Sequence, residues 1–258
     1  MTRLLTDLPQ PTAAALLDDD SVVVQPVGAL EQHGAHLPLN TDLVVPDAIA
    51  TAAVERVAAA GVDAWLLPPL AVSKSDEHHW AAGSIWLEAS TLWDTLLDIG
   101  RSVAATGAGS LVFVNGHGGN TALLGVVNRE IRRRHGLRTF SMGSGVQRAG
   151  DGVHGPDELG MGIHAGHSET SVMLALRPEL VRMDAAVRSV PEHIAEYTTI
   201  GFNGYPVSFG WTSDDFGASG VIGDPTGATA EYGRVLVEEG TAFVARALTE
   251  ISRFRHRG

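Results

Sequence analysis

Short β-branched runs alternate along this chain with longer stretches of helical periodicity, and this alternation constrains the fold more than any other feature. The strand-like runs cover residues 22–27, 64–67, 110–114 and 137–142. Helices are expected over residues 44–60, 91–106, 121–134, 169–176 and 228–251. Such alternation is typical of a parallel sheet that helices cover on both faces. The sequence therefore predicts an α/β fold with a mostly parallel central sheet.

The length of 258 residues and the apolar content of 44% suit one hydrophobic core. We find no internal repeat and no domain boundary, so we expect a single domain over residues 1–258. Residues 190–225 are rich in Gly, Pro, Ser and aromatic side chains and lack clear periodicity. Because a disordered linker would hold fewer aromatics, we expect a long ordered loop near the site or at a subunit contact.

Charge and cysteine content exclude several kinds of partner and site. The net charge of −12 argues against nucleic acid, because phosphate binding needs clustered Lys and Arg. No apolar run approaches the roughly 20 residues of a membrane span, and the amino terminus lacks a secretory signal, so a soluble cytoplasmic protein without a membrane partner is expected. Because the chain has no cysteine, any transition metal must be held by histidines and carboxylates.

Carboxylates and imidazoles gather after the first and third predicted strands. Glu31 and His33 follow the first strand, and in an extended segment their side chains point the same way. Asp42 lies where the next helix begins, and His117 follows the third strand in a glycine-rich loop. Strand ends of a parallel sheet converge on one edge, and this oxygen and nitrogen set suits Zn²⁺, Mn²⁺ or Fe²⁺. Structural roles stay open too, with Glu31 as a helix cap and His117 as a hydrogen-bonded loop histidine.

Three segments resemble the creatininase (creatinine amidohydrolase) family. They are residues 28–42, the loop Asn-Gly-His-Gly-Gly-Asn at 115–120, and His-Ala-Gly-His-Ser-Glu-Thr-Ser at 164–171. The resemblance runs in the same order from about residue 20 to 250. It implies a three-layer αβα sandwich, two divalent metals per chain, cyclic or linear amide substrates, and a homo-oligomer that is often a hexamer.

The resemblance also implies roles for individual residues. Glu31, Asp42 and His117 would hold one metal, and His33 and Asp42 the other, with the Asp42 carboxylate as the bridge. His164 aligns with the histidine to which creatininase assigns proton transfer, so it is the candidate general acid and base. The alternative is that His164 only orients the helix that follows it.

The chain departs from creatininase at the second metal. Creatininase carries a ligand Glu two residues after its loop histidine, where this sequence has Gly119. We expect Glu169 to supply the missing carboxylate and count it as a candidate catalytic residue, although a carboxylate at a helix amino terminus can also serve the helix dipole alone. The two tryptophans that close over creatinine are replaced by small residues near Gly143 and Gly160, so creatinine itself is not the expected substrate.

Three further residues are candidate substrate contacts. Glu77 and His78 lie in the loop after the second strand, where family members commonly carry Glu-His. His167 either donates to a ligand carboxylate or contacts the substrate.

Three functions remain open from the sequence. The main hypothesis is a metal-dependent amidohydrolase that cleaves the C–N bond of a small cyclic or linear amide with a metal-activated water. Residues 164–171, together with Gly-Val-Ile-Gly-Asp-Pro at 220–225, also resemble the branch of the family that acts on the mycofactocin precursor peptide. The alternative is therefore a peptidase that removes a carboxyl-terminal fragment from a short modified peptide. A non-catalytic, metal-stabilised binding protein is the third hypothesis.

Overall fold

The computed structural model describes residues 2–146, 157–202 and 204–256. Its described residues form a sheet of four parallel strands in the order β2-β1-β3-β4. These strands are β1 (Val22–Val27), β2 (Ala64–Leu66), β3 (Ser110–Asn115) and β4 (Arg138–Gly143). All six residues of β1 are buried, as expected for a central strand covered on both faces.

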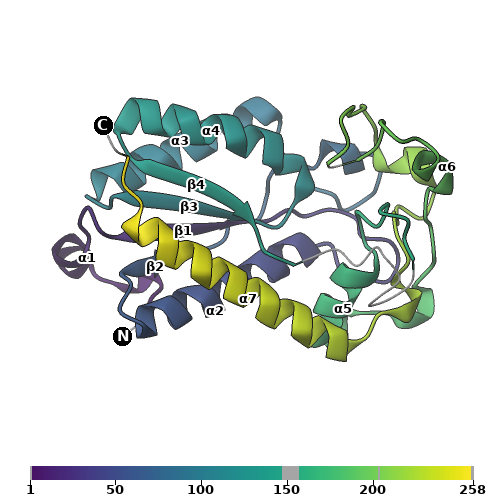
Figure 1. The fold of residues 1–258 in the computed structure, drawn as a ribbon, viewed down its shortest axis with the longest axis horizontal. Helices are drawn as coiled ribbons and strands as arrows, with labels where there is room; N and C mark the ends of the chain where they lie inside the picture. Colours follow the sequence, from purple (N-terminus) through teal and green to yellow (C-terminus); the bar gives the residue numbers. More distant parts are fainter. Residues whose placement is uncertain (1, 147–156, 203, 257–258) are drawn as a thin grey trace.

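Helices cover the two faces of the sheet (Figure 1). One face carries α3 (Ala89–Ala105) and α4 (Thr121–His135), and the other carries α2 (Thr41–Ala59) and α7 (Ala230–Arg253). Helix α5 (His167–Leu176) packs on α7 at the carboxyl edge of the strands. The remaining helices are short: α1 (Gln10–Leu16), α6 (Glu192–Ala195), and 3₁₀ turns at Leu5–Asp7, Asp76–His78, Gly118–Asn120, Pro178–Leu180, Met183–Ala185, Ser213–Phe216 and Pro225–Gly227.

Alternation along β1 divides the interior into two cores. Val22 and Val24 face the core under α2 and α7, whereas Val23 and Val27 face the core under α3 and α4. This is the period-two pattern of a strand with both faces buried. The predicted α/β fold, with three layers and a parallel sheet, is confirmed.

Some element boundaries differ from those predicted. Helix α2 begins at Thr41 instead of residue 44, so Asp42 lies inside its first turn. Residues 190–225 hold α6, a 3₁₀ turn and an aromatic cluster in which Trp211 packs edge-on against Phe202 and Phe216. This cluster supplies part of the wall of the site described below. Among the described helices, none combines the length and apolarity that a bilayer span requires.

A glycine brings the end of β3 against the start of α2. A Cβ atom at residue 116 would lie 2.3 Å from the backbone oxygen of Asp42 and 2.5 Å from Cγ of Pro46. Only a residue without a side chain permits this approach. The approach sets His117, the next residue, beside Asp42.

We expect Gly116→Ala to lower the free energy of unfolding by roughly 1–3 kcal/mol, because the added methyl group must displace backbone. Gly118→Ala is the matched control, since a Cβ atom there has no neighbour within 4 Å. Urea denaturation of both variants measures the difference. Equal free energies of unfolding in the two variants would show that the end of β3 does not approach α2 closely at residue 116.

Candidate metal centre

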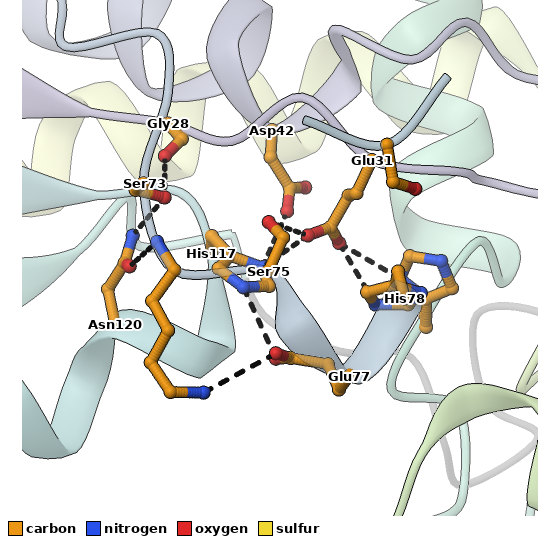
Figure 2. A network of polar contacts seen from close by, with 12 residues as sticks. Gly28, Glu31, Asp42, Ser73, Ser75, Glu77, His78, His117 and Asn120 are labelled. Carbon is orange, nitrogen blue, oxygen red and sulfur yellow. Dashed lines mark hydrogen bonds and ion pairs between the residues drawn. The ribbon is translucent and has the colours of Figure 1, made fainter. Parts of the chain in front are cut away.

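Loops after two parallel strands, together with the start of α2, bring four titratable side chains together. Glu31 and His33 follow β1, Asp42 lies in the first turn of α2, and His117 follows β3. Figure 2 shows Glu31 and Asp42 pointing toward His117. All four side chains are buried, and Glu31 and His33 have no exposed surface at all.

The Asp42 carboxylate lies between two imidazoles. Its Oδ1 is 3.2 Å from Nε2 of His33, and its Oδ2 is 3.0 Å from Nδ1 of His117. Nδ1 of His117 is also 3.1 Å from Oε2 of Glu31. One ligand atom from each of Glu31, Asp42 and His117 lies within 4.8 Å of the others, a spacing that one metal ion can bridge. Asp42 is thus placed to serve two neighbouring sites.

Glu169 lies on the His33 side of Asp42. Its Oε2 is 3.9 Å from Nε2 of His33 and accepts a hydrogen bond of 2.6 Å from the backbone N–H of Ala165. His33, His164 and Glu169 form a second group with the spacing of metal ligands. The structure therefore brings the Glu169 carboxylate to the His33 side of Asp42, as expected for a second metal site.

The three histidines His33, His164 and His78 lie side by side. The ring of His164 is 4.2 Å from that of His33 and 4.3 Å from that of His78. Nε2 of His78 is 3.3 Å from Oε1 of Glu31, and Nδ1 of His164 is 3.6 Å from the same oxygen. These contacts define a third possible ligand group, Glu31, His78 and His164.

Sequence reasoning missed Gln32, which orients two of these rings. The Gln32 amide donates to Nδ1 of His78 at 2.9 Å and to the carbonyl of Gly220 at 3.0 Å. The Gln32 backbone carbonyl accepts from Nε2 of His164 at 2.7 Å. His78 then carries its proton on Nε2, toward Glu31, and His164 presents an unprotonated Nδ1. The only signal in the sequence is the position of Gln32 between Glu31 and His33.

Hydroxyl and amide side chains tie the loops together beneath the site (Figure 2). The Ser75 hydroxyl donates to Oε2 of Glu31 at 2.6 Å. The Ser73 hydroxyl donates to the carbonyl of Gly28 at 2.6 Å and accepts from the Asn120 amide at 3.0 Å. The loop after β2 is thereby fixed to the loops after β1 and β3. Neither serine was singled out from the sequence, because a serine in a loop carries no distinctive pattern.

Opposite charges shift the pKa values of the central residues. Burial opposes the charged form of His33, but attraction to Asp42 and the nearby glutamates outweighs burial and raises the pKa of His33 to about 9. Burial likewise opposes the charged form of His117, yet Glu31, Asp42 and Glu77 hold its pKa well above the usual value. Burial favours the neutral acid of Asp42, but the two imidazoles keep its pKa well below the usual value.

The pKa values of His164 and His78 are lowered instead of raised. Burial, followed by repulsion from His33 and His78, lowers the pKa of His164 well below its ordinary value. Burial also lowers the pKa of His78, against the attraction of Glu31. Both rings are therefore neutral near pH 7, and a neutral imidazole is the form that accepts a proton or binds a metal.

Two cavities adjoin the cluster. The larger, of ≈ 360 Å³, is lined by His164, Glu169 and His167, and also by Asn115, Gly143 and Ser168. The smaller, of ≈ 160 Å³, is lined by Glu31, Glu77 and His78, with Trp211 as its aromatic wall. Asp42, His117, His164 and Glu169 border both. Gly160, expected near the substrate, lines neither cavity, and His167 stacks on Tyr232.

These residues fit divalent metal ions. The donors are imidazole nitrogens and carboxylate oxygens, which are the ligands that Zn²⁺, Mn²⁺ and Fe²⁺ accept. Oε1 of Glu31 is buried, and the described residues give it only the longer contacts with His78 and His164, without hydrogen-bond geometry. Converging buried carboxylates are costly unless cations compensate them. A pair of metals sharing Asp42 would supply that compensation.

The raised pKa of His33 makes stability depend on pH. A base whose pKa rises on folding stabilises the fold while protonated, so this contribution is complete below about pH 6.5 and is lost as pH rises toward about 9. Its size is on the order of 3 kcal/mol. In chelator-treated protein, wild type should lose more stability between these pH values than His33→Gln does. Urea denaturation at each pH measures the free energy of unfolding of the two proteins. Equal losses in wild type and His33→Gln would contradict the raised pKa of His33.

Comparison with known proteins gives a consistent family. The family model described as creatinine amidohydrolase matches residues 6–248. A mycofactocin precursor peptide peptidase of Mycobacterium ulcerans is 36% identical over 241 residues, which cover 92% of this chain and 88% of that protein. The creatinine amidohydrolase of Pseudomonas putida is 32% identical over 245 residues, which cover 90% of each chain.

Solved structures agree with this result. A manganese form of creatininase is 27% identical, with a TM-score of 0.76, over 98% of this chain and all of the other. A zinc form of a creatininase mutant is 26% identical, with a TM-score of 0.74, over the same shares of the two chains. The family expected from the sequence motifs is confirmed, and the chain belongs to the creatininase family of amidohydrolases.

Proposed function

We propose that this protein is a dinuclear metal-dependent peptidase that cleaves an amide bond in a short peptide. The observation that carries the proposal is the placement of the histidine–carboxylate cluster between two cavities, so that a chain can extend on both sides of the bond to be cut. The similarity to proteins named mycofactocin precursor peptide peptidase supports the same substrate class. This favours the peptidase alternative over the small-amide hypothesis.

Two metal sites would share Asp42. Glu31, Asp42 and His117 would hold one ion, and His33, Asp42 and Glu169 the other. When bound, such ions polarise a carbonyl oxygen and lower the pKa of water. Similar creatininase structures exist as manganese and zinc forms, so these are the first metals to test, with iron as a further possibility from the donor set.

His164 would move the proton. Its Nε2 is engaged by the Gln32 carbonyl, and its unprotonated Nδ1 lies 3.6 Å from Oε1 of Glu31 at the border of both cavities. The lowered pKa keeps the ring neutral near pH 7, so the lone pair of Nδ1 is available for a proton from water. It can then pass that proton to the leaving nitrogen, the usual role of a histidine acid and base.

The longer part of the peptide would lie in the larger cavity. Its ≈ 360 Å³ falls within the range of sites that enclose drug-sized ligands. Asn115 and Ser168 offer polar groups there, and Gly143 leaves space where a bulky residue would close the cavity. His167 lines the same cavity and stays a candidate substrate contact.

A small amide is the second candidate substrate. The cavity of ≈ 160 Å³ has the size for a compact ligand and places the indole of Trp211 beside Glu31, His78 and His164. A planar amide could lie against that indole. Assembly into a homo-oligomer, including a hexamer, stays a prediction from the family resemblance.

A substrate panel tests the proposed function. Manganese- or zinc-loaded protein should hydrolyse peptides from dipeptides to decapeptides with varied carboxyl-terminal residues, in preference to cyclic amides such as creatinine. Glu31→Gln should reduce turnover by more than about 100-fold, since changes outside the ligand shell alone cost 10- to 100-fold. Liquid chromatography with mass spectrometry measures the hydrolysis products of wild type and of Glu31→Gln. Hydrolysis of cyclic amides alone would contradict the peptidase, and full activity in Glu31→Gln would contradict the site.

Metal content tests the role of Glu169. Wild type should bind two ions per chain, and Glu169→Ala should bind one, because its second site would keep only His33 and Asp42. Exposed Glu179, three residues beyond α5, provides a matched control as Glu179→Ala. Elemental mass spectrometry after dialysis gives the count. Two ions retained in Glu169→Ala would remove Glu169 from the ligand set.

A further inference from the structure

Glu77 contacts the nitrogen of His117 that faces away from the proposed metal. Nδ1 of His117 points to Glu31 and Asp42, at 3.1 Å and 3.0 Å. Nε2, on the other side of the ring, is 3.3 Å from Oε1 of Glu77. Figure 2 shows the Glu77 carboxylate on this side of the ring. An imidazole that binds a metal through Nδ1 must carry its proton on Nε2, and that proton lies next to Glu77.

The Glu77 carboxylate is held in place from its own loop. Its side chain is only 12% exposed, and Nζ of Lys74 lies 3.6 Å from its Oε2. Lys74 also contacts Asp76, at 2.6 Å, so the lysine binds the first two residues of the same 3₁₀ turn. The Ser213 hydroxyl donates to the Glu77 backbone carbonyl at 3.1 Å, which fixes the turn from the far side.

Gly119 leaves the space that Glu77 occupies. A Cβ atom at residue 119 would lie 2.3 Å from Oε1 of Glu77 and 2.4 Å from Nε2 of His117. A side chain at this position would therefore separate the carboxylate from the ring. The lack of a side chain at residue 119 therefore lets the Glu77 carboxylate approach the His117 ring in this protein.

We propose that Glu77 is a positioning residue that fixes the tautomer and orientation of His117, so that Nδ1 binds metal, and that Gly119 is the condition for this contact. The inference rests on the proposed metal site at Glu31, Asp42 and His117. A carboxylate behind a metal-bound histidine raises the basicity of the ligand and locks its ring. Glu77 also lines the smaller cavity, so the substrate contact expected from the sequence stays a prediction beside this role.

Zinc affinity of the Glu77 variants tests the proposal. Competition with a chromophoric chelator should show Zn²⁺ binding roughly 10- to 100-fold weaker in Glu77→Ala. Glu77→Gln, which keeps an acceptor oxygen and the same shape, should recover part of the loss. Asp76→Asn is the control, because it removes a neighbouring charge from the same turn without contact to His117 and should bind zinc as wild type does.

A second measurement separates positioning from general stability. In zinc-loaded wild type, long-range ¹H–¹⁵N spectra should show His117 protonated at Nε2, and this signal should broaden or shift in Glu77→Ala. A merely structural role would lower the unfolding free energy and leave both the zinc affinity and the tautomer unchanged.

The outcomes distinguish this inference from the proposed function. If His117→Ala keeps the full zinc content, the metal site itself is wrong. If His117→Ala loses zinc but Glu77→Ala binds it as tightly as wild type, the site stands and the positioning role is overturned. An equal loss in Glu77→Ala and Asp76→Asn would likewise overturn it, because net charge alone would explain the change.

Discussion

The carboxylate of Asp42, held between the imidazoles of His33 and His117, is the interaction around which the site is built. Its two oxygens lie 3.2 Å and 3.0 Å from nitrogens of different loops. Asp42 can reach both because it lies in the first turn of α2, where the helix dipole favours a negative charge. Gly116 lets the end of β3 approach that turn closely enough to deliver His117. Fold and site therefore depend on the same few contacts.

The parallel sheet explains why these groups meet. Loops after β1 and β3 leave the sheet at the same edge, and the loop after β2 is fixed to both by Ser73 and Asn120. Buried polar groups converge there, which is costly for a fold and useful for a hydrolase. Cavities on two sides of the cluster then favour a substrate that is a chain over one that is a compact ring.

The sequence contained enough information for the fold and for the centre of the site. The strand at residues 22–27 was predicted with the observed bounds, because a run of buried β-branched residues has few other solutions. Glu31, His33, Asp42 and His117 could be grouped because parallel strand ends converge. The contacts of Gln32 with Gly220 and of Glu77 with His117 could not be predicted. Those contacts depend on the paths of loops far apart in the chain, which no local pattern encodes.

The most direct test of this account is an anomalous diffraction map from crystals grown with Mn²⁺. Two peaks are expected on opposite sides of the Asp42 carboxylate, one near Glu31 and His117 and the other near His33 and Glu169. A single peak, or peaks that do not share Asp42, would contradict the dinuclear centre.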